Sequence, residues 1–465
     1  MRFPCLSPPA SRVILSLGFV VMSSCGTSND APSVPEPSGP WAVRDGFLHD
    51  AEGRVLVLRG ANLSGAHKSP PYFGFHQPAD YARLVQKWGM NSIRFLVEWA
   101  AIEPQKGVYD DVYLNEVAKR VGWARDAGLL VVMDMHQDIY GEGFGGDGAP
   151  RWTCDESHYE AFTPTSPWMM NYLSLEVQAC YDGLWNSEEL HAHYAEAWRR
   201  VAEKLQDNSA VVGFDVINEP HWGSMVMASF EEQKLQHFYE HVVPVVRSAA
   251  PQWVAFLEPS AGRNIGVRTG LTTFPFPNVV YAPHSYDATA EQGGGFNPTS
   301  RTVLMAKVKA LNEEARELNA ALWIGEYGGT FDAPGIDAYM DAQYDGMASV
   351  VASSAYWTYD KGGYGLLDSD GNEQKVLLDL VVRPYPQRVA GTPLTVEFDE
   401  ATRTFRFTWR PDRSIAAPTV IAVPSRVYGT GYQVECAGCA VEKTEEFLTI
   451  ASPGPGDQVT LTLRP

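Results

Sequence analysis

The sequence predicts an α/β protein, a (β/α)8 TIM barrel followed by a small C-terminal antiparallel β-sandwich domain. Eight apolar, β-branched runs alternate with helical patterns between residues 41 and 382, and such alternation is typical of parallel sheets. After about residue 382 the alternation stops, and short strand patterns follow one another with turn residues between them. Eight strand–helix units over roughly 330 residues fit a single barrel.

The predicted barrel strands share β-branched and aromatic residues, the composition of strands that are buried on both faces. They lie at residues 55–61, 92–98, 129–136, 211–219, 254–258, 279–286, 321–326 and 350–357. Between the third and fourth strands, apolar residues recur at helical spacing, which predicts a helix packed against the sheet. These residues are Tyr194, Trp198, Val201 and Leu205.

A short hairpin is predicted before the first barrel strand, with strands at 41–43 and 47–48 and a turn at Asp45-Gly46. For the C-terminal domain, residues 383–465, strands are predicted at 394–398, 404–409, 419–423 and 459–463. Two interpretations of this domain remain: a carbohydrate-binding module, and a domain that packs against the barrel. The sequence shows no row of aromatic residues that favours the first.

Residues 1–25 predict a signal peptide, because Arg2 and Arg12 come before an apolar stretch, Val13 to Met22, that is too short to span a bilayer. The stretch runs into Ser23-Ser24-Cys25-Gly26, which is similar to a bacterial lipobox whose cysteine is acylated. Met22 stands where such motifs prefer Leu, so ordinary signal-peptidase cleavage is the alternative. Residues 26–40 are rich in Pro and Ser and predict a flexible tether. We therefore expect an exported protein, secreted or anchored to a membrane through Cys25.

The net charge of −20 argues against nucleic acid and anionic membranes as electrostatic partners and leaves neutral sugars open. Four cysteines lie outside the leader, and an even number in an exported chain predicts two disulfides, Cys154–Cys180 and Cys436–Cys439. A four-cysteine zinc site is the rival interpretation, but the sequence holds only one C-x-x-C pair. We expect no metal and no cofactor.

Two predicted strands end in a glutamate: VVGFDVINEP (211–220) contains Glu219, and ALWIGE (321–326) ends in Glu326. A charge at the end of a buried strand is costly unless it has a role, and the active sites of these barrels lie at that end. Two carboxyl groups are what hydrolysis of a glycosidic bond requires. Glu219 and Glu326 are therefore the predicted catalytic pair. The alternative is two surface glutamates in strand-to-helix loops.

Other strand ends carry side chains with a use in such a site. Arg94 and Tyr286 can keep a carboxylate ionised, Asn218 can hydrogen-bond a sugar hydroxyl, and Trp357 offers a flat apolar face. Taken singly, each has a structural interpretation, such as an ion pair or core packing.

Two histidines also follow predicted strands, His136 and His284. A buried core histidine is the structural interpretation of His136. Together with Asp134 the two histidines could suggest a metallohydrolase, but that interpretation needs further ligands at strand ends.

The set of strand-end residues resembles glycoside hydrolase family 5, a clan of retaining (β/α)8 barrels. The matching residues are Arg94, His136, Asn218-Glu219-Pro220, His284-x-Tyr286, Glu326 and Trp357. More narrowly, three segments are similar to the endoglycoceramidases, which cut whole glycans from the ceramide of glycosphingolipids. These segments are DMHQDIYG (134–141), GDGAPRW (146–152) and RPYPQRVAGTP (383–393).

The resemblance implies that Glu219 is the acid/base and Glu326 the nucleophile of a retaining endo-β-glycosidase. It also implies that Asp138 and Lys68 contact the sugar, and that the Trp357–Thr358 peptide is cis. In this mechanism Glu219 needs a proton, so we expect burial and the charge of Glu326 to raise its pKa. One departure is the long loop over residues 150–186, which Cys154 and Cys180 bracket.

A lipid-linked substrate requires an apolar groove beside the sugar pocket. The sequence offers Trp168, Met169, Met170 and Tyr172 in the long loop, and Trp222, Met225, Val226, Met227 and Phe230 after Glu219. Ordinary loop packing is the alternative. Other substrates also remain: those of an endo-β-glucanase, a mannanase or a steryl-β-glucosidase of the same family. A non-catalytic, sugar-binding surface lipoprotein would need neither glutamate.

Overall fold

The computed structural model describes residues 40–63, 66–291, 294–429, 431–444 and 446–465. The predicted signal peptide, Cys25 and all but the last residue of the predicted tether lie outside the described residues. Within the described part of the chain, no helix combines the length and the apolar character needed to cross a bilayer.

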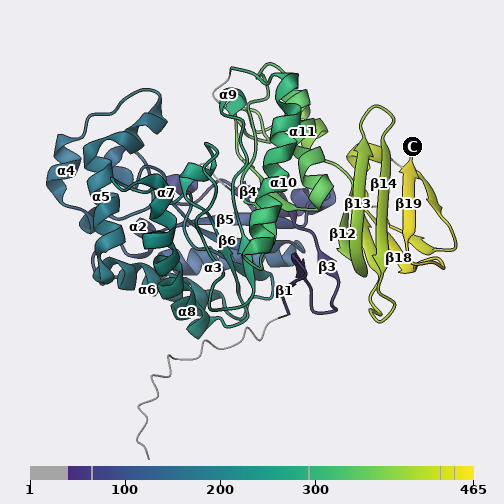
Figure 1. Ribbon diagram of the computed structural model, residues 1–465, viewed down its shortest axis with the longest axis horizontal. Helices are drawn as coiled ribbons and strands as arrows, with labels where there is room; N and C mark the ends of the chain where they lie inside the picture. The colour runs from purple at the N-terminus through teal and green to yellow at the C-terminus, as the bar shows by residue number, and fades with distance from the viewer. Residues whose placement is uncertain (1–39, 64–65, 292–293, 430, 445) are drawn as a thin grey trace, which may run out of the picture. The chain divides into compact units, whose positions relative to one another are not determined.

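Eight parallel strands close into a barrel, which confirms the predicted fold class (Figure 1). In order around the barrel they are β4 (Arg59–Leu63), β5 (Ser92–Glu98), β6 (Leu130–His136), β7 (Val211–Asp215), β8 (Val254–Leu257), β9 (Val279–Tyr281), β10 (Ala321–Ile324) and β11 (Ser353–Tyr356). Pairing of β11 with β4 closes the barrel. Several strands stop earlier than predicted, because the chain leaves the ladder before it reaches residues such as Glu219 and Tyr286.

Helices alternate with these strands along the chain. The longer ones are α1 (Pro78–Gln86), α3 (Asp111–Asp126), α6 (Glu188–Leu205), α8 (Gln236–Ala249), α10 (Arg301–Glu317) and α11 (Ile336–Val350). The shorter ones are α2 (Trp99–Ile102), α7 (Met227–Phe230), α9 (Ala288–Glu291) and α12 (Lys375–Val381). All four residues of the predicted apolar stripe are buried on α6.

Helix α6 also fixes the chain that leads to Glu219. The side chain of Ser187 caps the helix by accepting from the Leu190 N–H, which satisfies a backbone donor of the first turn. Further along, the Tyr194 hydroxyl and the Trp198 indole N–H both donate to the carbonyl of Val216, each at 2.9 Å. The segment between β7 and Glu219 is therefore held from outside the barrel.

The predicted long loop over residues 150–186 is largely helical. It contains α4 (Glu156–Ala161), a 3-10 turn (Trp168–Leu173) and α5 (Leu175–Asn186). Capping side chains at Asp155 and Ser174 accept from the first turns of α4 and α5. Such caps are a readable helix signal, so the sequence contained the information that this segment is not a simple loop.

Both predicted disulfides are present, Cys154–Cys180 and Cys436–Cys439. The first ties the chain ahead of α4 to α5, and the second lies at the end of a strand in the C-terminal domain. Because all four cysteines are bonded in pairs, none of them is free to bind zinc.

Replacing Cys154 and Cys180 together by serine is expected to lower the free energy of unfolding by about 3 kcal/mol, because the bond closes a long loop in the unfolded chain. The two cysteines are 26 residues apart, whereas Cys436 and Cys439 are 3 apart. The matched double serine variant of the second pair should therefore lose less, about 2 kcal/mol. Denaturant unfolding of the oxidised proteins measures both. A larger loss for the second pair would contradict the explanation.

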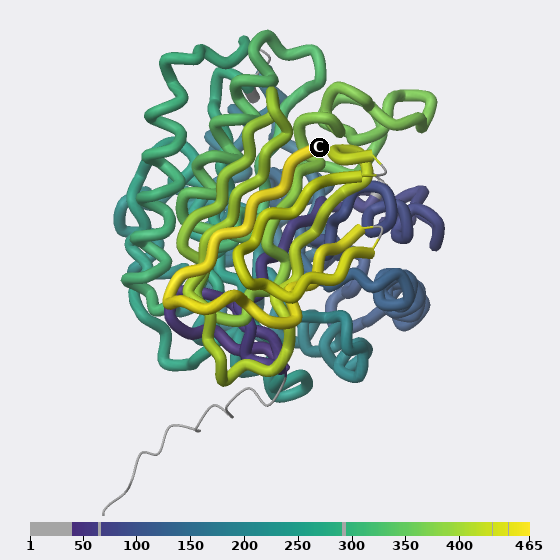
Figure 2. Tube along the Cα trace, turned by 90° about the vertical axis from the view of Figure 1, so that its right-hand side faces the viewer, coloured from purple at the N-terminus to yellow at the C-terminus, as the bar shows by residue number. Residues whose placement is uncertain are grey.

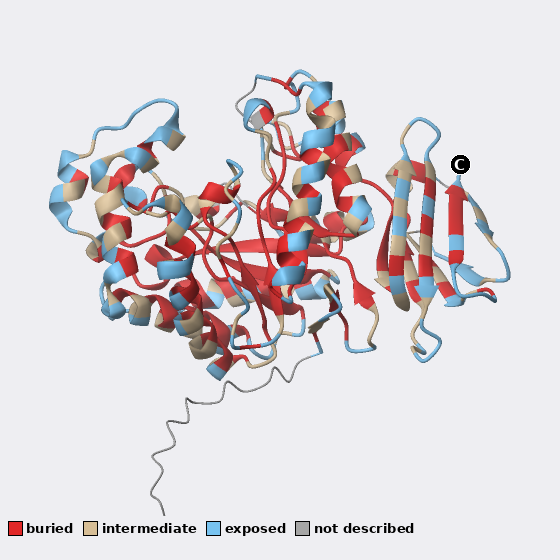
Figure 3. Ribbon diagram, in the orientation of Figure 1, coloured by how far each residue is buried: buried red, intermediate tan, exposed pale blue. Residues whose placement is uncertain are grey.

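Two antiparallel sheets form the C-terminal β-sandwich, as predicted. The smaller holds, in order, β13 (Gly391–Asp399), β14 (Thr404–Pro411), β19 (Val459–Arg464) and β16 (Gln433–Cys436). On β14, buried Phe405, Phe407 and Trp409 alternate with more exposed residues, and Figure 3 shows this alternation along the strand. Figure 2 shows the strands of this domain side by side.

The larger sheet contains strands from both ends of the chain. Its order is β1 (Ala42–Arg44), β2 (Phe47–His49), β3 (Val55–Leu56), β12 (Tyr385–Val389), β15 (Thr419–Ala422), β18 (Phe447–Ser452) and β17 (Ala440–Lys443). The predicted hairpin is β1 and β2, with Ala42 paired to His49. This hairpin continues through β3 to β12, where Val55 pairs with Val389, a connection that was not predicted. No local sequence pattern indicates a pairing between strands so far apart in the chain.

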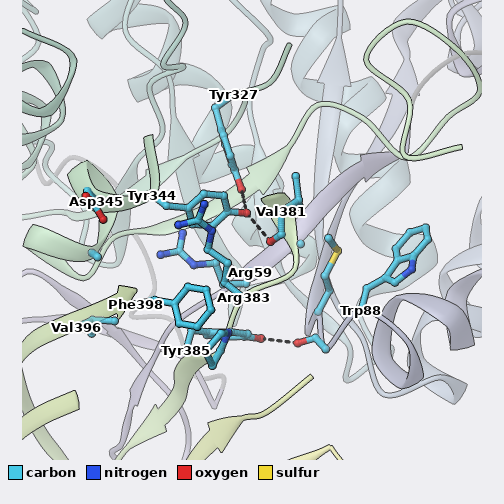
Figure 4. Close-up of a pocket in the computed structure, with 15 residues that line it drawn as sticks. Arg59, Trp88, Tyr327, Tyr344, Asp345, Val381, Arg383, Tyr385, Val396 and Phe398 are labelled. Carbon is cyan, nitrogen blue, oxygen red and sulfur yellow. Dashed lines mark hydrogen bonds between the residues drawn. The ribbon is translucent and has the colours of Figure 1, made fainter. Parts of the chain in front are cut away.

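Aromatic and arginine side chains line a small cavity between the barrel and the start of the C-terminal domain (Figure 4). The Tyr344 hydroxyl donates to the carbonyl of Val381 at 2.7 Å and lies 2.9 Å from the hydroxyl of Tyr327. The guanidinium of Arg383 lies over the Tyr344 ring, 4.4 Å from its centroid. Hydrogen bonds and a cation–π contact thus join the end of the barrel to the chain that enters the sandwich.

Candidate active site

Glu326 follows β10 by two residues and is 5% exposed at the carboxyl end of the barrel. Its Oε1 accepts from Nη1 of Arg94 at 2.6 Å, and its Oε2 accepts from the Tyr286 hydroxyl at 3.0 Å. The preceding Gly325 is needed for space, because a Cβ there would lie 3.1 Å from the His284 ring. Two donors therefore hold the carboxylate, and these are the two that sequence analysis named for this purpose.

Arg94, on β5, is completely buried and gathers polar groups from several strands around one guanidinium. Besides Glu326 it contacts Asp134 Oδ1, Asp215 Oδ2, Glu258 Oε1 and Asn218 Oδ1, each at 2.9 Å, and Asn62 Oδ1 at 3.2 Å. Four carboxyl groups therefore surround a single guanidinium cation. Burial, together with the charge of Glu258, raises the pKa of Asp215 well above its usual range.

Asn62, Asp215 and Glu258 were not among the predicted site residues. Glu258 directly follows β8 and ends the predicted fifth strand, so the strand-end rule applied to Glu219 would have found it. Asn62 and Asp215 lie within their strands, and the sequence does not show that their side chains point into the barrel.

Glu219 lies beyond β7 with a positive φ of 40°, a backbone region that non-glycine residues seldom occupy. Its N–H donates to Oε2 of Glu258 at 2.9 Å. Its Oε1 is 2.7 Å from Nδ1 of His284 and accepts from the Asn264 side chain at 2.8 Å. The site therefore holds the carboxyl group of Glu219 in one orientation.

The expectation of a raised pKa for Glu219 is wrong in this structure. Burial does act in the raising direction, but the hydrogen bond and the positive charge of His284 outweigh it, so the pKa of Glu219 is lowered. His284 also lies 3.2 Å from Glu258 Oε1 and 3.6 Å from Glu326 Oε2. Although burial opposes it, these carboxylates raise the pKa of His284 well above its ordinary value. The imidazolium thus connects both predicted catalytic glutamates.

A second charged group lies beside Trp357, which the predicted cis peptide joins to Thr358. Nζ of Lys68 forms an ion pair with Asp138 and lies 4.6 Å from the centroid of the Trp357 ring. The His136 ring is nearly parallel to the same tryptophan, at 5.5 Å and 14°. The structure therefore brings three predicted residues, Lys68, Asp138 and His136, together beside the Trp357 ring.

His136 is held in place by carboxylates. Its Nδ1 is 2.7 Å from Asp134 Oδ2, and its Nε2 is 3.7 Å from Asp138 Oδ2. Burial and the charge of Lys68 act to lower its pKa, yet the two aspartates raise the pKa of His136 to about 9. The hydrogen bond of Nδ1 fits the alternative interpretation of a satisfied core histidine. The ring itself lies against Trp357 in the site.

The amide of Asn218, 2% exposed, is engaged on both sides. Its Oδ1 accepts from Arg94, and its Nδ2 donates to the carbonyl of Gln137 at 3.1 Å. In return, Nε2 of Gln137 donates to the carbonyl of Asn218 at 2.7 Å. These bonds hold the chain just ahead of Glu219 against the end of β6.

Two groups of side chains have the spacing of metal ligands, but each already holds a cation of its own. His136, Asp138 and Asp147 surround Lys68, whose Nζ is 3.9 Å from Asp147. Glu219, His284 and Glu326 contain the His284 imidazolium, whose pKa is raised. A metal ion would have to displace these charges, so the metallohydrolase interpretation finds no support in either group.

Apolar side chains are exposed beside Glu219, on the 150–186 insert and on the segment after Pro220. Trp168 and Leu173 are each 51% exposed and Val226 is 72% exposed. The insert meets the other segment where Tyr172 stacks on His221 at 5.0 Å. The predicted groove residue Phe230 belongs to the core instead, since it is fully buried.

Family models match both parts of the chain. The model for cellulase (glycosyl hydrolase family 5) covers residues 49–363, and the model for the glycoside hydrolase family 5 C-terminal domain covers residues 383–463. The chain belongs to glycosyl hydrolase family 5. As a family 5 member it is a glycoside hydrolase, and the predicted family resemblance is confirmed.

This family 5 enzyme is similar to proteins named endoglycoceramidases. It is 26% identical to endoglycoceramidase I of Rhodococcus hoagii, over 90% of this chain and 87% of that protein. It is 32% identical to endo-glycoceramidase II from Rhodococcus sp., solved as a ganglioside GM3 complex, with a TM-score of 0.82 over 90% of this chain and 99% of the other. Sterylglucosidase 1 of Cryptococcus neoformans, at 16% identity and a TM-score of 0.79, covers 93% of this chain and 99% of its own and shares the fold.

Proposed function

We propose that this family 5 enzyme is a retaining endo-β-glycosidase that hydrolyses the bond between glycan and ceramide in glycosphingolipids. The observation that carries the proposal is the closeness of Glu219 and Glu326. One carboxylate oxygen of each glutamate and a ring nitrogen of His284 all lie within 4.8 Å of one another. Retaining enzymes hold their two carboxyl groups ~5–5.5 Å apart, whereas inverting enzymes need a wider gap that admits water. The names of the Rhodococcus relatives support the substrate class.

In the first step, Glu326 attacks the anomeric carbon and the bond to the leaving oxygen breaks as Glu219 delivers a proton to it. Arg94 and Tyr286 donate to Glu326 and hold its carboxylate in position until the covalent bond forms. The proton lies in the Glu219–His284 pair, whose oxygen and nitrogen are 2.7 Å apart. In the second step, Glu219 takes a proton from water, which attacks the glycosyl–enzyme ester and releases the glycan.

The apolar side chains beside Glu219 fit a lipid leaving group. Trp168, Met170, Leu173 and Leu175 of the insert, together with Val226, are the residues that expose apolar surface there. Glu219 protonates the departing oxygen, so the group on that oxygen leaves from the same side. An acyl chain fits such a loosely shaped aromatic and methionine surface.

Replacing His284 by glutamine is expected to shift the alkaline limb of the pH profile of kcat/KM to lower pH. In the wild type the Glu219–His284 pair keeps its proton up to the raised pKa of His284, whereas in the variant the proton rests on the Glu219 carboxyl group alone, which loses it at lower pH than an imidazolium with a raised pKa. A pH series with a β-glycoside whose leaving group needs protonation measures the limb. His237→Gln, which alters a histidine with a 71% exposed side chain, is the matched control. An unmoved limb, or one at higher pH, would contradict the explanation.

A panel of substrates tests the proposed function. The purified enzyme is incubated with lactosylceramide, globo-series lipids, GM1-type gangliosides, a steryl β-glucoside and carboxymethyl-cellulose, and the released sugars are identified by mass. We expect intact oligosaccharides from the glycosphingolipids. Glucose released only from the steryl glucoside, or oligomers released only from the cellulose, would establish one of the alternative substrates instead. No release from any of them would indicate a non-catalytic sugar-binding protein.

A further inference from the structure

A groove of about 590 Å³ is lined in part by Tyr72, which feels the charge of Asp147 beside Lys68. Its walls come from the segment after β4, from α2 and the start of α3, and from the loop after β6. Aromatic and apolar residues such as Tyr72, Phe73, Val112 and Pro150 line it, and Glu142 and Arg151 add charge. We call it the distal groove. None of its residues takes part in the mechanism above.

The loop after β6 connects the distal groove to the active site. Asp138, which pairs with Lys68, exchanges two backbone hydrogen bonds of 3.0 Å with Asp147. Asp147 in turn lies 3.9 Å from Nζ of Lys68, and Pro150 follows it by three residues and lines the groove. The carbonyl of Gly148 accepts from the N–H of Ala100, which fixes this loop to α2. The loop after β6 therefore carries Asp138 of the Lys68 ion pair and also lines the groove.

The position of the groove relative to the scissile bond follows from the catalytic residues. The leaving group departs from the Glu219 side, where the exposed apolar residues lie. We assign the sugar that Glu326 retains as an ester to the Trp357 and Lys68 side, because these are the predicted sugar contacts. The distal groove, whose Tyr72 feels the charge of Asp147 beside Lys68, is therefore assigned to the glycan, not the lipid.

The lining has the chemistry of a sugar subsite, in which a flat aromatic face accompanies a hydroxyl partner. Tyr72 is half-buried and has a φ of 62°, so the local backbone is held in a region that a bulky residue rarely adopts. Its hydroxyl hydrogen-bonds to Glu142, and burial together with that carboxylate raises the pKa of Tyr72 to about 12. The phenol therefore stays neutral. Phe73 adds a second ring, which stacks on Tyr113 at 5.0 Å.

The charges in the groove discriminate between neutral and acidic sugars. Asp110 and Glu142 form no ion pair with any residue in the described part of the chain. Arg151, the cation of the lining, is already paired with Glu156. A sialic acid carboxylate would meet like charge here, which costs free energy.

We propose that the distal groove is a subsite for the third sugar of a neutral glycan, beyond the sugars that contact Trp357 and Lys68. This inference rests on the proposed function, since it requires a glycosphingolipid substrate. If so, the enzyme prefers glycosphingolipids with longer neutral glycans to lactosylceramide. It also prefers a neutral third sugar to sialic acid.

The test compares three substrates with the wild-type enzyme: lactosylceramide, a neutral trihexosylceramide and GM3, in the same detergent. We expect kcat/KM for the trihexosylceramide to exceed that for lactosylceramide by roughly 2- to 10-fold, the factor that one aromatic face contact is worth. GM3 should fall below the trihexosylceramide, and the gap should widen at low ionic strength because salt screens charge repulsion.

Two variants assign the effect to the groove. Tyr72→Ala should bring the ratio of the trihexosylceramide to lactosylceramide close to one. Glu142→Gln should raise the ratio of GM3 to the trihexosylceramide. Tyr432→Ala, which removes a half-buried tyrosine from the C-terminal domain, is the matched control and should leave both ratios at the wild-type value.

Equal kcat/KM for lactosylceramide and the trihexosylceramide in the wild type would overturn the inference and leave the proposed function standing. A loss in Tyr72→Ala that is the same for both substrates would show a structural role and also overturn it. If no glycosphingolipid is cleaved, the proposed function fails and the subsite fails with it.

Discussion

Replacing Glu326 by glycine is expected to lower kcat on every β-glycoside by at least about 10⁴-fold, the scale seen when a covalent nucleophile is removed. Without this carboxylate no glycosyl ester can form, whatever the leaving group. The fold should persist, because Arg94 keeps Asp134, Asp215 and Glu258 as partners. Steady-state rates on an activated aryl glycoside and on lactosylceramide measure the loss, and circular dichroism checks the fold.

A matched control for this variant is Glu52→Gly, which removes an exposed glutamate from the turn between β2 and β3. It should keep the wild-type rate. If Glu326→Gly turned over at a comparable rate, the reacting carboxylates would have to lie elsewhere in the protein.

Replacing Glu219 by alanine is expected to separate the two steps of the reaction. On a natural substrate the rate should fall by ~10²–10⁴-fold or more, because the leaving oxygen no longer receives a proton. A dinitrophenyl β-glycoside needs no such proton, so it should still form the ester with Glu326. The ester should then accumulate, since no base remains to activate water. A burst of dinitrophenolate and the mass of the glycosylated enzyme measure this outcome.

Azide provides the stereochemical check. It attacks the stranded ester without a general base, and two inversions at the anomeric carbon give the β-glycosyl azide. Added azide should therefore restore turnover of Glu219→Ala on the dinitrophenyl glycoside. Formation of the α-azide by this variant would mean that the roles of Glu219 and Glu326 are reversed.

The strand-end rule explains why much of the site could be predicted from the sequence. Glu326 and Arg94 stand out because charge interrupts or follows an apolar run, and the barrel brings the ends of all such runs to one edge. Asp215, the last residue of β7, also interrupts an apolar run, but the charge alone does not show which face of the strand carries it. Whether its side chain points inward depends on the tilt and register of the closed barrel, which a single run of residues does not encode.

The pKa of Glu219 illustrates a different limit. The sequence shows that Glu219 is buried near another glutamate, and from those two facts a raised pKa follows. The structure adds Nδ1 of His284, from a residue 65 positions away, at 2.7 Å. That single contact reverses the direction. Electrostatic predictions depend on side-chain orientations at the level of ångströms, and alternation of apolar residues carries no such information.

The sharing of one sheet by β3 and β12 affects how the chain folds. Val55 and Val57, near the start of the protein, are buried in the same apolar cluster as Phe405 and Trp409. During synthesis these first strands leave the ribosome more than 300 residues ahead of β12, which starts at Tyr385. They can pair with one another, but one edge of β3 has no partner until the last part of the chain arrives. A protein cut after the barrel would keep that open edge permanently, and an open strand edge invites pairing with a second chain. We therefore expect that the barrel of this enzyme is not a separable catalytic unit.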